Sequence, residues 1–392
     1  MNSIVLKLPE KVSLDEFAEI KKQLFFVSES ILSISLTEDY KNIEVMFVSA
    51  PQRAVLEALE KEIKSLMQAF ELSKNKAIFK KNFFKSQSIE PIQPLQLEQL
   101  NLAKPLGSGI YAYAGILQKL LNGLDSHFQK IAINMGAKEL IFPNLIKTET
   151  LLKTGYLKNF PHQSQIVYDP HSGIDNLRNL REHLNHNRAL EKTENLDSFF
   201  KPSDFCLTPA VCYHCYEFHQ NSQLENRKPL IVTAVQSCYR FEGKSTGGLE
   251  RLREFKMREI IAMGSVREIH DVQKIFIDVL SNLCDEFELN CHLKPANDPF
   301  FIDDYNAKRI FQTGFDLKLE LLAQFQSAPS IAVSSINYHQ NYFGNAFKIK
   351  LEDDGFAHSC CIGFGLDRWI ATIISAHGTD PKSWPKKLRT LV

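Results

Sequence analysis

The sequence predicts an α+β protein in three parts: a small N-terminal module (residues 1–72), a linker (73–99) and a larger domain (100–392). Two observations support this fold class. The first segments alternate between the period of two typical of strands and the wider period typical of amphipathic helices. The larger domain combines a two-stranded hairpin pattern at residues 238–259 with long apolar patterns of helical period.

The N-terminal module is predicted to contain three strands and two helices. We expect strand 3–8, helix 14–23, strand 31–36, strand 43–48 and helix 51–69. Pro51 suits a helix start, and VLEALEKEIKSLMQAF is clearly amphipathic. The linker that follows is rich in Lys, Gln and Pro.

Charge and cysteine content narrow the functional class. The chain has 46 basic and 46 acidic residues, whereas a tRNA-gripping protein usually has a basic surface. Residues 74–85 are a candidate basic patch, but a solvated linker is the favoured interpretation. We expect a cytoplasmic protein with no membrane segment, in which the eight Cys stay reduced and serve packing, metals or catalysis.

Two helices and one insertion are predicted in the larger domain. An apolar stripe from Ile116 to Ile131 predicts a helix that ends near Gly136. Ser265 and Glu268 form a capping-box pattern at the start of a helix that runs to about residue 288. Residues 170–197, rich in Asn, His and charge, are expected to form a surface insertion.

The segment CYRFEGKSTGGLERLREFKMRE, residues 238–259, reads as strand, Gly/Ser/Thr tip and returning strand. The period of two places Arg240 and Glu242 on one face, and Phe255 and Glu259 on one face of the return. An Arg and two carboxylates on one surface suit a bound triphosphate. A solvated charged hairpin is the alternative.

A second segment, CCIGFGLDRWIATII, residues 360–374, favours the phosphate interpretation. Gly363 and Gly365 are expected to form a turn into a helix, which places Arg368 in its first turn. There the side-chain charge adds to the unpaired backbone N–H groups of the helix start, and together they suit a phosphate.

These two segments resemble motifs 2 and 3 of the class II aminoacyl-tRNA synthetases, and GAKELIFPNLI with Pro143 resembles motif 1. The seryl-type pattern GLxRxxxFxxxE falls on Gly248, Leu249, Arg251, Phe255 and Glu259. The resemblance covers roughly residues 100–392. It implies an antiparallel sheet flanked by helices and a homodimer formed through motif 1.

The resemblance also implies an ATP site. Arg240 would clamp the α-phosphate, Phe255 would stack on adenine and Arg368 would hold the γ-phosphate. Glu242 and Arg251 would belong to the same nucleotide site. Such preplaced cations suit adenylate formation, in which charge develops on phosphate oxygens.

Asn337 aligns with a family residue that reaches the substrate, whereas Ile331 stands where the family places an acid used around ATP and Mg²⁺. Mg²⁺ is expected to accompany ATP, but the sequence does not identify its ligands.

A zinc site is implied beside the ATP site. Two relatives, the amino acid:[carrier protein] ligases and the atypical seryl-tRNA synthetases of methanogens, share a Cys/Glu/Cys set that matches Cys212, Glu259 and Cys361. Bound Zn²⁺ would take the substrate's neutral amine in its open fourth position. Buried structural thiols are the alternative, and Cys215 or Cys360 could replace an assigned ligand.

The carrier protein ligases are the favoured relatives, because residues 1–72 are too short for the coiled-coil arm that typical seryl enzymes use on tRNA. This resemblance implies ATP-dependent activation of a small amino acid, glycine or alanine. The amino acid would then pass to the phosphopantetheine thiol of an acyl or peptidyl carrier protein. The alternatives are a zinc-dependent seryl-type tRNA ligase and a non-catalytic regulatory paralogue that binds an amino acid or nucleotide.

Overall fold

The computed structural model describes residues 2–72, 77–83, 89–186, 196–225, 228–243, 248–296, 317–353 and 355–392. Parts of three predicted segments therefore lie outside the described residues: 73–76 and 84–88 of the linker, 187–195 of the insertion and 244–247 of the hairpin tip. Within the described residues, none of the helices has both the length and the apolar character needed to span a bilayer.

The N-terminal module has the elements that its sequence predicts. They are β1 (Asn2–Lys7), α1 (Leu14–Leu24), β2 (Ile31–Leu36), β3 (Asn42–Phe47) and α2 (Arg53–Leu72). The strands pair antiparallel in the order β1-β3-β2, and the helices close over a separate apolar core. Ser13 and Glu16 form a capping box at the start of α1. Pro51 precedes α2 by two residues, so the helix starts later than expected.

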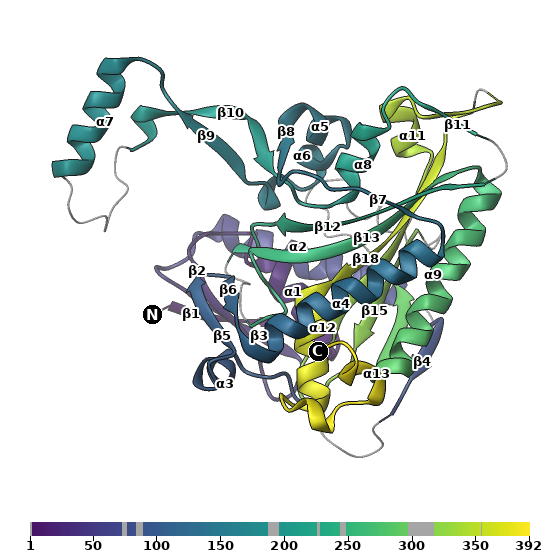
Figure 1. Cartoon of the computed structure of the whole chain (residues 1–392). Helices are drawn as coiled ribbons and strands as arrows, with labels where there is room; N and C mark the ends of the chain where they lie inside the picture. Colours follow the sequence, from purple (N-terminus) through teal and green to yellow (C-terminus); the bar gives the residue numbers. More distant parts are fainter. Residues whose placement is uncertain are drawn as a thin grey trace.

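The larger domain is organised by an eight-stranded sheet in the order β4-β14-β15-β16-β18-β13-β12-β7 (Figure 1). The strands are β4 (Phe79–Lys81), β7 (Lys138–Glu139), β12 (Leu230–Tyr239), β13 (Glu254–Gly264), β14 (Cys291–Pro295), β15 (Lys318–Ala323), β16 (Ile331–Gln340) and β18 (His358–Gly365). Neighbouring strands pair antiparallel, as expected, except that β7 runs parallel to β12. The segment expected to be a linker thus contributes an edge strand, β4.

Three long helices cover one face of this sheet: α4 (Gly115–Asn134), α9 (Val266–Phe287) and α12 (Leu366–His377) (Figure 1). Ile260, Ile336 and Ile362, from three neighbouring strands, lie in the core cluster shared with these helices and are fully buried. The two helix predictions are confirmed, since α4 ends just before Gly136 and Ser265 caps α9 with its capping box.

An ion-pair network ties the central strand β13 to this helical layer. Arg258 is 1% exposed, and its guanidinium contacts Asp125 of α4 at 2.5 Å and Glu139 of β7 at 3.3 Å. Side chains alternate along a strand, so Arg258 and its neighbour Glu259 point to opposite faces of the sheet. The face that carries Glu259 is the one on which the candidate site lies.

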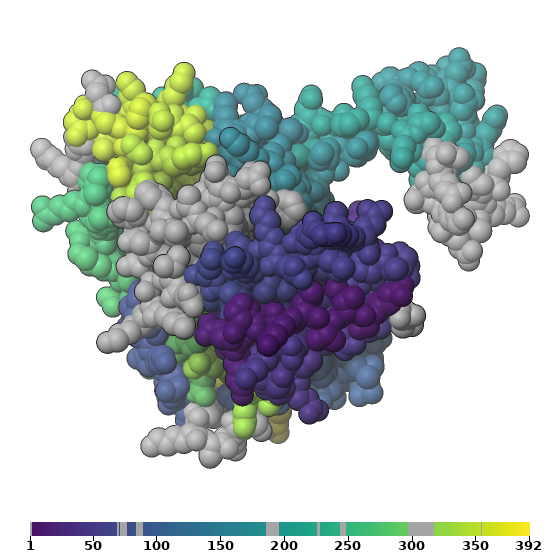
Figure 2. Space-filling model, turned by 180° about the vertical axis from the view of Figure 1, so that it is seen from behind, coloured from purple at the N-terminus to yellow at the C-terminus, as the bar shows by residue number. Residues whose placement is uncertain are grey.

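The remaining elements surround the sheet. They are α3 (Pro94–Gln99), β5 (Ala103–Gly107), β6 (Ile110–Tyr113), β8 (Leu145–Lys147), α5 (Thr148–Lys153), α6 (Tyr156–Asn159), β9 (Ile166–Pro170), α7 (Ile174–His186), β10 (Phe200–Leu207), α8 (Cys212–Phe218), β11 (Gln223–Leu224), α11 (Tyr342–Phe347), β17 (Lys350–Leu351) and α13 (Lys386–Arg389). The β9–α7–β10 segment projects as an arm from the body in both views (Figures 1 and 2), as the predicted surface insertion requires.

Candidate functional site

Four residues of three neighbouring strands share the sheet face opposite α4, α9 and α12. In the register of the sheet, Glu259 of β13 lies beside Gly363 of β18, and Cys361 of β18 lies beside Asn337 of β16. A Cβ on Gly363 would stand 3.1 Å from the Met257 sulfur and 3.8 Å from Cγ of Glu259. Glycine at this position therefore leaves room beside the Glu259 carboxylate.

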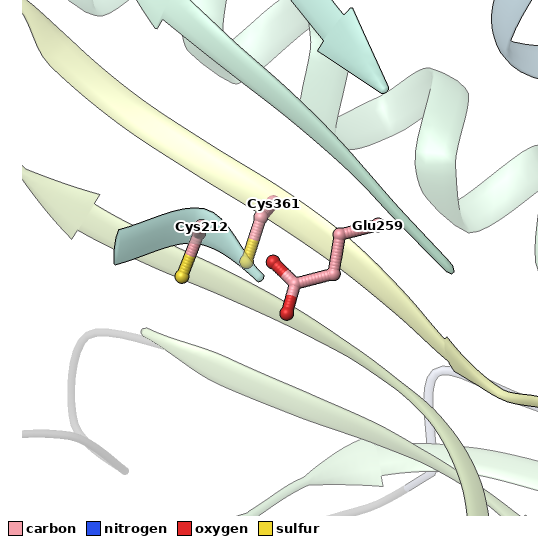
Figure 3. A group of neighbouring side chains, drawn as sticks. All are labelled: Cys212, Glu259 and Cys361. Carbon is pink, nitrogen blue, oxygen red and sulfur yellow. The ribbon is translucent and has the colours of Figure 1, made fainter. Parts of the chain in front are cut away.

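Cys212, the first residue of α8, completes a group with Glu259 and Cys361 that we call the Cys/Glu/Cys group (Figure 3). All three side chains are buried, and one ligand atom of each lies within 4.8 Å of the others. The Val211 amide donates to Oε1 of Glu259 at 3.3 Å, whereas Oε2 is buried without a hydrogen-bond partner. An unpartnered buried carboxylate oxygen normally requires an explanation, such as a bound ion.

The electrostatics of this group favour a cation. Burial, with the nearby Cys361 sulfur, raises the pKa of the Glu259 carboxyl well above its usual value. The hydrogen bond between the thiols favours a thiolate at Cys361, lowering its pKa and raising that of Cys212. Two sulfurs and one carboxylate are a donor set that Zn²⁺ prefers, so the residues present fit this metal.

Neighbouring side chains set the surroundings of Cys361. Its sulfur lies 3.7 Å from Nδ2 of Asn337 and 4.0 Å from Nε2 of His339. The other nitrogen of that imidazole, Nδ1, lies 3.2 Å from the Tyr216 hydroxyl. Asn337 and His339 therefore both lie beside the Cys361 sulfur, and Tyr216, which contacts His339, is a neighbour that the sequence did not reveal.

The structure separates the group from the two cysteines that could have replaced a ligand. Cys360 lies on the helical side of the sheet, where its sulfur is 3.9 Å from the carbonyl oxygen of Ile269. Cys215, one helical turn after Cys212, is fully buried and lies outside the Cys/Glu/Cys group. Among the described residues, Cys212 and Cys361 are thus the pair that converges on Glu259.

Two histidines that follow Cys212 in the chain, His214 and His219, contact aromatic rings. His214 stacks on Phe142, with ring centroids 5.6 Å apart. His219 contacts Phe218, with ring centroids 5.0 Å apart. These contacts are consistent with a packing role for both side chains.

Arg240, Arg251 and Arg368, with Glu242, form a second group that we call the cation cluster. β12 ends at Tyr239, so Arg240 and Glu242 lie beyond the strand, and the expectation that both belong to it is wrong. Nε of Arg240 donates to the carbonyl oxygen of Pro209 at 3.0 Å, and its guanidinium lies 5.2 Å from the centroid of the Phe255 ring.

Arg368 lies in the first turn of α12, as predicted. The expected turn at Gly363 is absent, because β18 continues through Gly365 directly into the helix. The guanidinium of Arg368 donates to the carbonyl oxygens of Glu250, at 2.8 Å, and Ala332, at 3.0 Å. These two carbonyls fix the orientation of the side chain.

Glu242 is buried at the centre of the cation cluster and contacts Arg251 at 3.5 Å. Burial alone would raise the pKa of this carboxyl, but four surrounding cations outweigh burial and hold the pKa below its usual value. In decreasing order of effect they are Lys22, Arg251, Arg240 and Arg368. So many cations around one carboxylate form a site suited to a further anion.

The residue at the expected acid position, Ile331, is a buried side chain at the start of β16. A carboxylate of the neighbouring strand, Glu320 of β15, pairs with Lys318 at 2.9 Å and acts electrostatically on Arg368. Sequence reasoning missed Lys22, Lys318 and Glu320. The β15 pair could have been found from its alternation, but no local pattern marks Lys22.

Comparison with known proteins places both groups within one domain. The family model for the tRNA synthetase class II core domain (G, H, P, S and T) matches residues 199–377. This range includes the Cys/Glu/Cys group and all three arginines of the cation cluster.

Two relatives and one solved structure extend this similarity. The chain is 28% identical to amino acid–[acyl-carrier-protein] ligase 1 of Bradyrhizobium diazoefficiens, over 72% of this chain and 85% of the relative. It is 25% identical to the type-2 serine–tRNA ligase of Methanococcus aeolicus, over 72% of this chain but only 55% of that enzyme. The SerRS of M. kandleri, solved in complex with A. aeolicus tRNASec, superposes with a TM-score of 0.69 and 18% identity, covering 99% of this chain and 77% of that one.

Proposed function

We propose that this chain, whose residues 199–377 carry a class II tRNA synthetase core domain, is an ATP-dependent amino acid:[carrier protein] ligase. The observation that carries the proposal is that the Cys/Glu/Cys group lies near the cation cluster, whose Arg240 acts electrostatically on Glu259. The first group would bind an amino acid and the second a nucleotide. The similarity to a ligase that loads acyl carrier proteins supports the choice of acceptor.

In the first reaction the amino acid carboxylate attacks the α-phosphorus of ATP, and pyrophosphate leaves. Arg240 would bind the α-phosphate, Arg368 the γ-phosphate, and Phe255 would stack on adenine. Arg251 and Glu242 would orient the nucleotide through their ion pair. Catalysis would come from positioning and from preplaced charge, so no protein nucleophile is required.

Cys212, Glu259 and Cys361 would hold Zn²⁺ in the amino acid site, and Mg²⁺ would accompany ATP. When bound, zinc supplies a Lewis acid that takes the substrate's neutral amine as a ligand. Asn337 lies against the Cys361 sulfur and would contribute to the same substrate site.

We propose glycine or alanine as substrate, as the resemblance to the carrier protein ligases implies. In the second reaction the phosphopantetheine thiol of a carrier protein attacks the adenylate carbonyl, and AMP leaves.

A homodimer formed through the motif 1 segment is part of the proposal, supported by Ile141, which is 94% exposed there. So is a reducing, cytoplasmic location that preserves both thiols.

A second candidate function is a zinc-dependent tRNA ligase. It is supported by one observation: the likeness to the M. kandleri SerRS fold extends over 99% of this chain and so includes the N-terminal module. The equal numbers of basic and acidic residues favour the carrier protein over tRNA as acceptor.

An amino acid screen by ATP–pyrophosphate exchange tests the first reaction. We expect exchange that depends on glycine or alanine and is lost when zinc is chelated. Strong exchange with a large amino acid would reject the substrate assignment. If none of the amino acids supported exchange, the proposed function would be rejected and a regulatory nucleotide-binding role would remain.

A further inference from the structure

The N-terminal module is attached to the larger domain at both ends of α1. In the first turn, the Asp15 carboxylate accepts hydrogen bonds from the backbone N–H of Ser330 at 2.7 Å and from its hydroxyl at 3.1 Å. Just after the helix, the Phe26 ring packs edge-on against His162, with centroids 4.6 Å apart. The module therefore lies on the face of the sheet away from the long helices, where Figure 2 shows it from behind.

Both attachment points border the cation cluster. Ser330 stands two residues before Ala332, whose carbonyl accepts from Arg368. Phe26 lies against Gly243, the residue after Glu242, since a Cβ placed there would be 3.6 Å from the Phe26 ring. Helix α1 thus extends from the Arg368 side of the cluster to its Glu242 side.

Lys22 occupies the last turn of α1, one turn before Phe26, and its side chain is partly buried. Besides Glu19 on its own helix, the charges that act on it belong to Arg251, Glu242 and Lys318 of the larger domain. Of the four cations that act on Glu242, Lys22 has the largest effect.

This placement is unfavourable without an anion. Among the described residues, no carboxylate lies within ion-pair distance, 4.0 Å, of the Lys22 ammonium, while Arg251 and Lys318 oppose its charge. Glu242 and Glu320 already pair with these two cations, at 3.5 Å and 2.9 Å. A ligand with several negative charges would relieve the repulsion between all of these side chains at once.

We propose that Lys22 is a nucleotide-binding residue that contacts the phosphate chain of ATP, so that the N-terminal module completes the nucleotide site. This inference rests on the proposed function, because it assumes that the cation cluster binds ATP. It gives the module a role within the first reaction. Asp15 is then a positioning residue, since it acts by holding α1 over the cluster.

Calorimetric titration of the full-length protein with ATP and Mg²⁺ tests the inference directly. Lys22→Ala should weaken ATP binding about tenfold, the effect of losing one charge-assisted contact. Lys22→Arg, which keeps the charge, should retain most of the affinity. Lys21→Ala is the matched control, because the neighbouring Lys21 lies in the same helical turn and has no ion pair or side-chain hydrogen bond within the described residues. It should bind ATP like the wild type.

Separate KM values for ATP and for the amino acid test the same assignment. In ATP–pyrophosphate exchange, Lys22→Ala should raise the KM for ATP and leave the KM for the amino acid unchanged. Asp15→Ala should do the same to a smaller extent. Unchanged ATP affinity in Lys22→Ala would overturn the inference. Equal weakening of ATP and amino acid binding together with a lowered Tm would also overturn it, because Lys22 would then be structural.

Different measurements test the proposed function and this inference: the function is tested with the wild-type protein, and the inference by comparing Lys22→Ala with the wild type. Wild-type protein that binds no ATP would reject both. Wild type that binds ATP but catalyses no exchange would reject the function, and the calorimetric comparison of Lys22→Ala with wild type would still decide the role of Lys22.

Discussion

At the scale of single residues, the Cys/Glu/Cys group makes the strongest claim. Glu259 is 3% exposed and keeps one carboxylate oxygen without a hydrogen-bond partner, and both thiols lie beside it. Burying a charged carboxylate in this way is unfavourable: either the group takes up a proton, as the raised pKa of Glu259 indicates, or a cation shares the site.

We therefore expect Cys212→Ser to lose both bound zinc and amino acid affinity. Zinc measured by mass spectrometry of the purified protein should fall from about one ion per chain to near zero, because a serine hydroxyl is a poor zinc ligand. The control is Cys215→Ser, which alters a buried thiol outside the group and should keep its zinc. Stoichiometric zinc in Cys212→Ser, Cys361→Ser and Glu259→Ala alike would show that the ligand set is wrong.

Arg240 and Arg368 allow a test of the nucleotide site. Alanine at either position should lower the rate of ATP–pyrophosphate exchange by about a hundredfold or more, because each removes a preplaced charge from the phosphates. Folding should be largely intact in both variants, as checked by circular dichroism and Tm. Arg267→Ala, a substitution of an arginine in the first turn of α9, provides a control. Wild-type activity in Arg240→Ala or Arg368→Ala would refute their assignment to ATP.

Which of these residues could be predicted from the sequence depends on how local their signal is. Arg240, Glu259 and Arg368 belong to continuous motifs, so the resemblance identified each by number. Tyr216 contacts His339, which in turn lies beside the Cys361 sulfur, and these contacts exist only because α8 folds against the sheet. Lys22 is more than 200 residues from its neighbours in the cation cluster, and no periodicity within residues 14–24 marks it as different from Lys21.

At the scale of elements, helix patterns and caps predicted α4 and α9 closely, since their apolar stripes and the Ser265 capping box are local features. Strand limits were less predictable. The sequence alternation continues past Tyr239, but the paired register with β13 ends at Glu254. One further backbone hydrogen bond joins Arg240 N–H to the Arg253 carbonyl at 3.0 Å, and the next amide, that of Phe241, donates instead to Gln163. The partner strand decides where pairing ends, and that information is not local.

The contact between Phe26, just after α1, and His162, before β9, leads us to predict a pH-dependent stability. Burial, with the charge of Lys22, lowers the pKa of His162 to about 4 from its ordinary 6.5. The folded state therefore favours neutral His162, a contribution that is complete above pH 6.5 and is lost as the pH falls towards 4.

His162→Gln should accordingly lose less stability than the wild type between pH 6.5 and 4. After allowance for the exposure of the ring, the difference should be on the order of 1 kcal/mol in the free energy of unfolding. Urea unfolding at several pH values measures it, and His270→Gln, at an exposed histidine, is the control. Parallel pH profiles for wild type and His162→Gln would contradict the assigned pKa shift.

At the scale of the whole molecule, the two faces of the eight-stranded sheet have different roles: one forms the core and the other carries the candidate site. One face packs on α4, α9 and α12 and stabilises the fold, with Arg258 anchored to Asp125 beneath it. The other face carries the Cys/Glu/Cys group, the cation cluster lies near this group, and the N-terminal module packs beside the cluster. The alternation of side chains along β13, β16 and β18 produces this division.

The proposed dimer and the choice of acceptor also belong to this scale. The motif 1 segment exposes Ile141, so we expect a homodimer. Sedimentation equilibrium should give twice the chain mass for the wild type. A monomer at micromolar concentration would reject this part of the proposal.

The most direct test of the central claim is transfer of labelled amino acid to two acceptors, holo carrier protein and total tRNA, with apo carrier protein as control. The account predicts label on the holo carrier alone, released by hydroxylamine as expected for a thioester. Label on tRNA, with none on the carrier protein, would contradict it and identify a tRNA ligase.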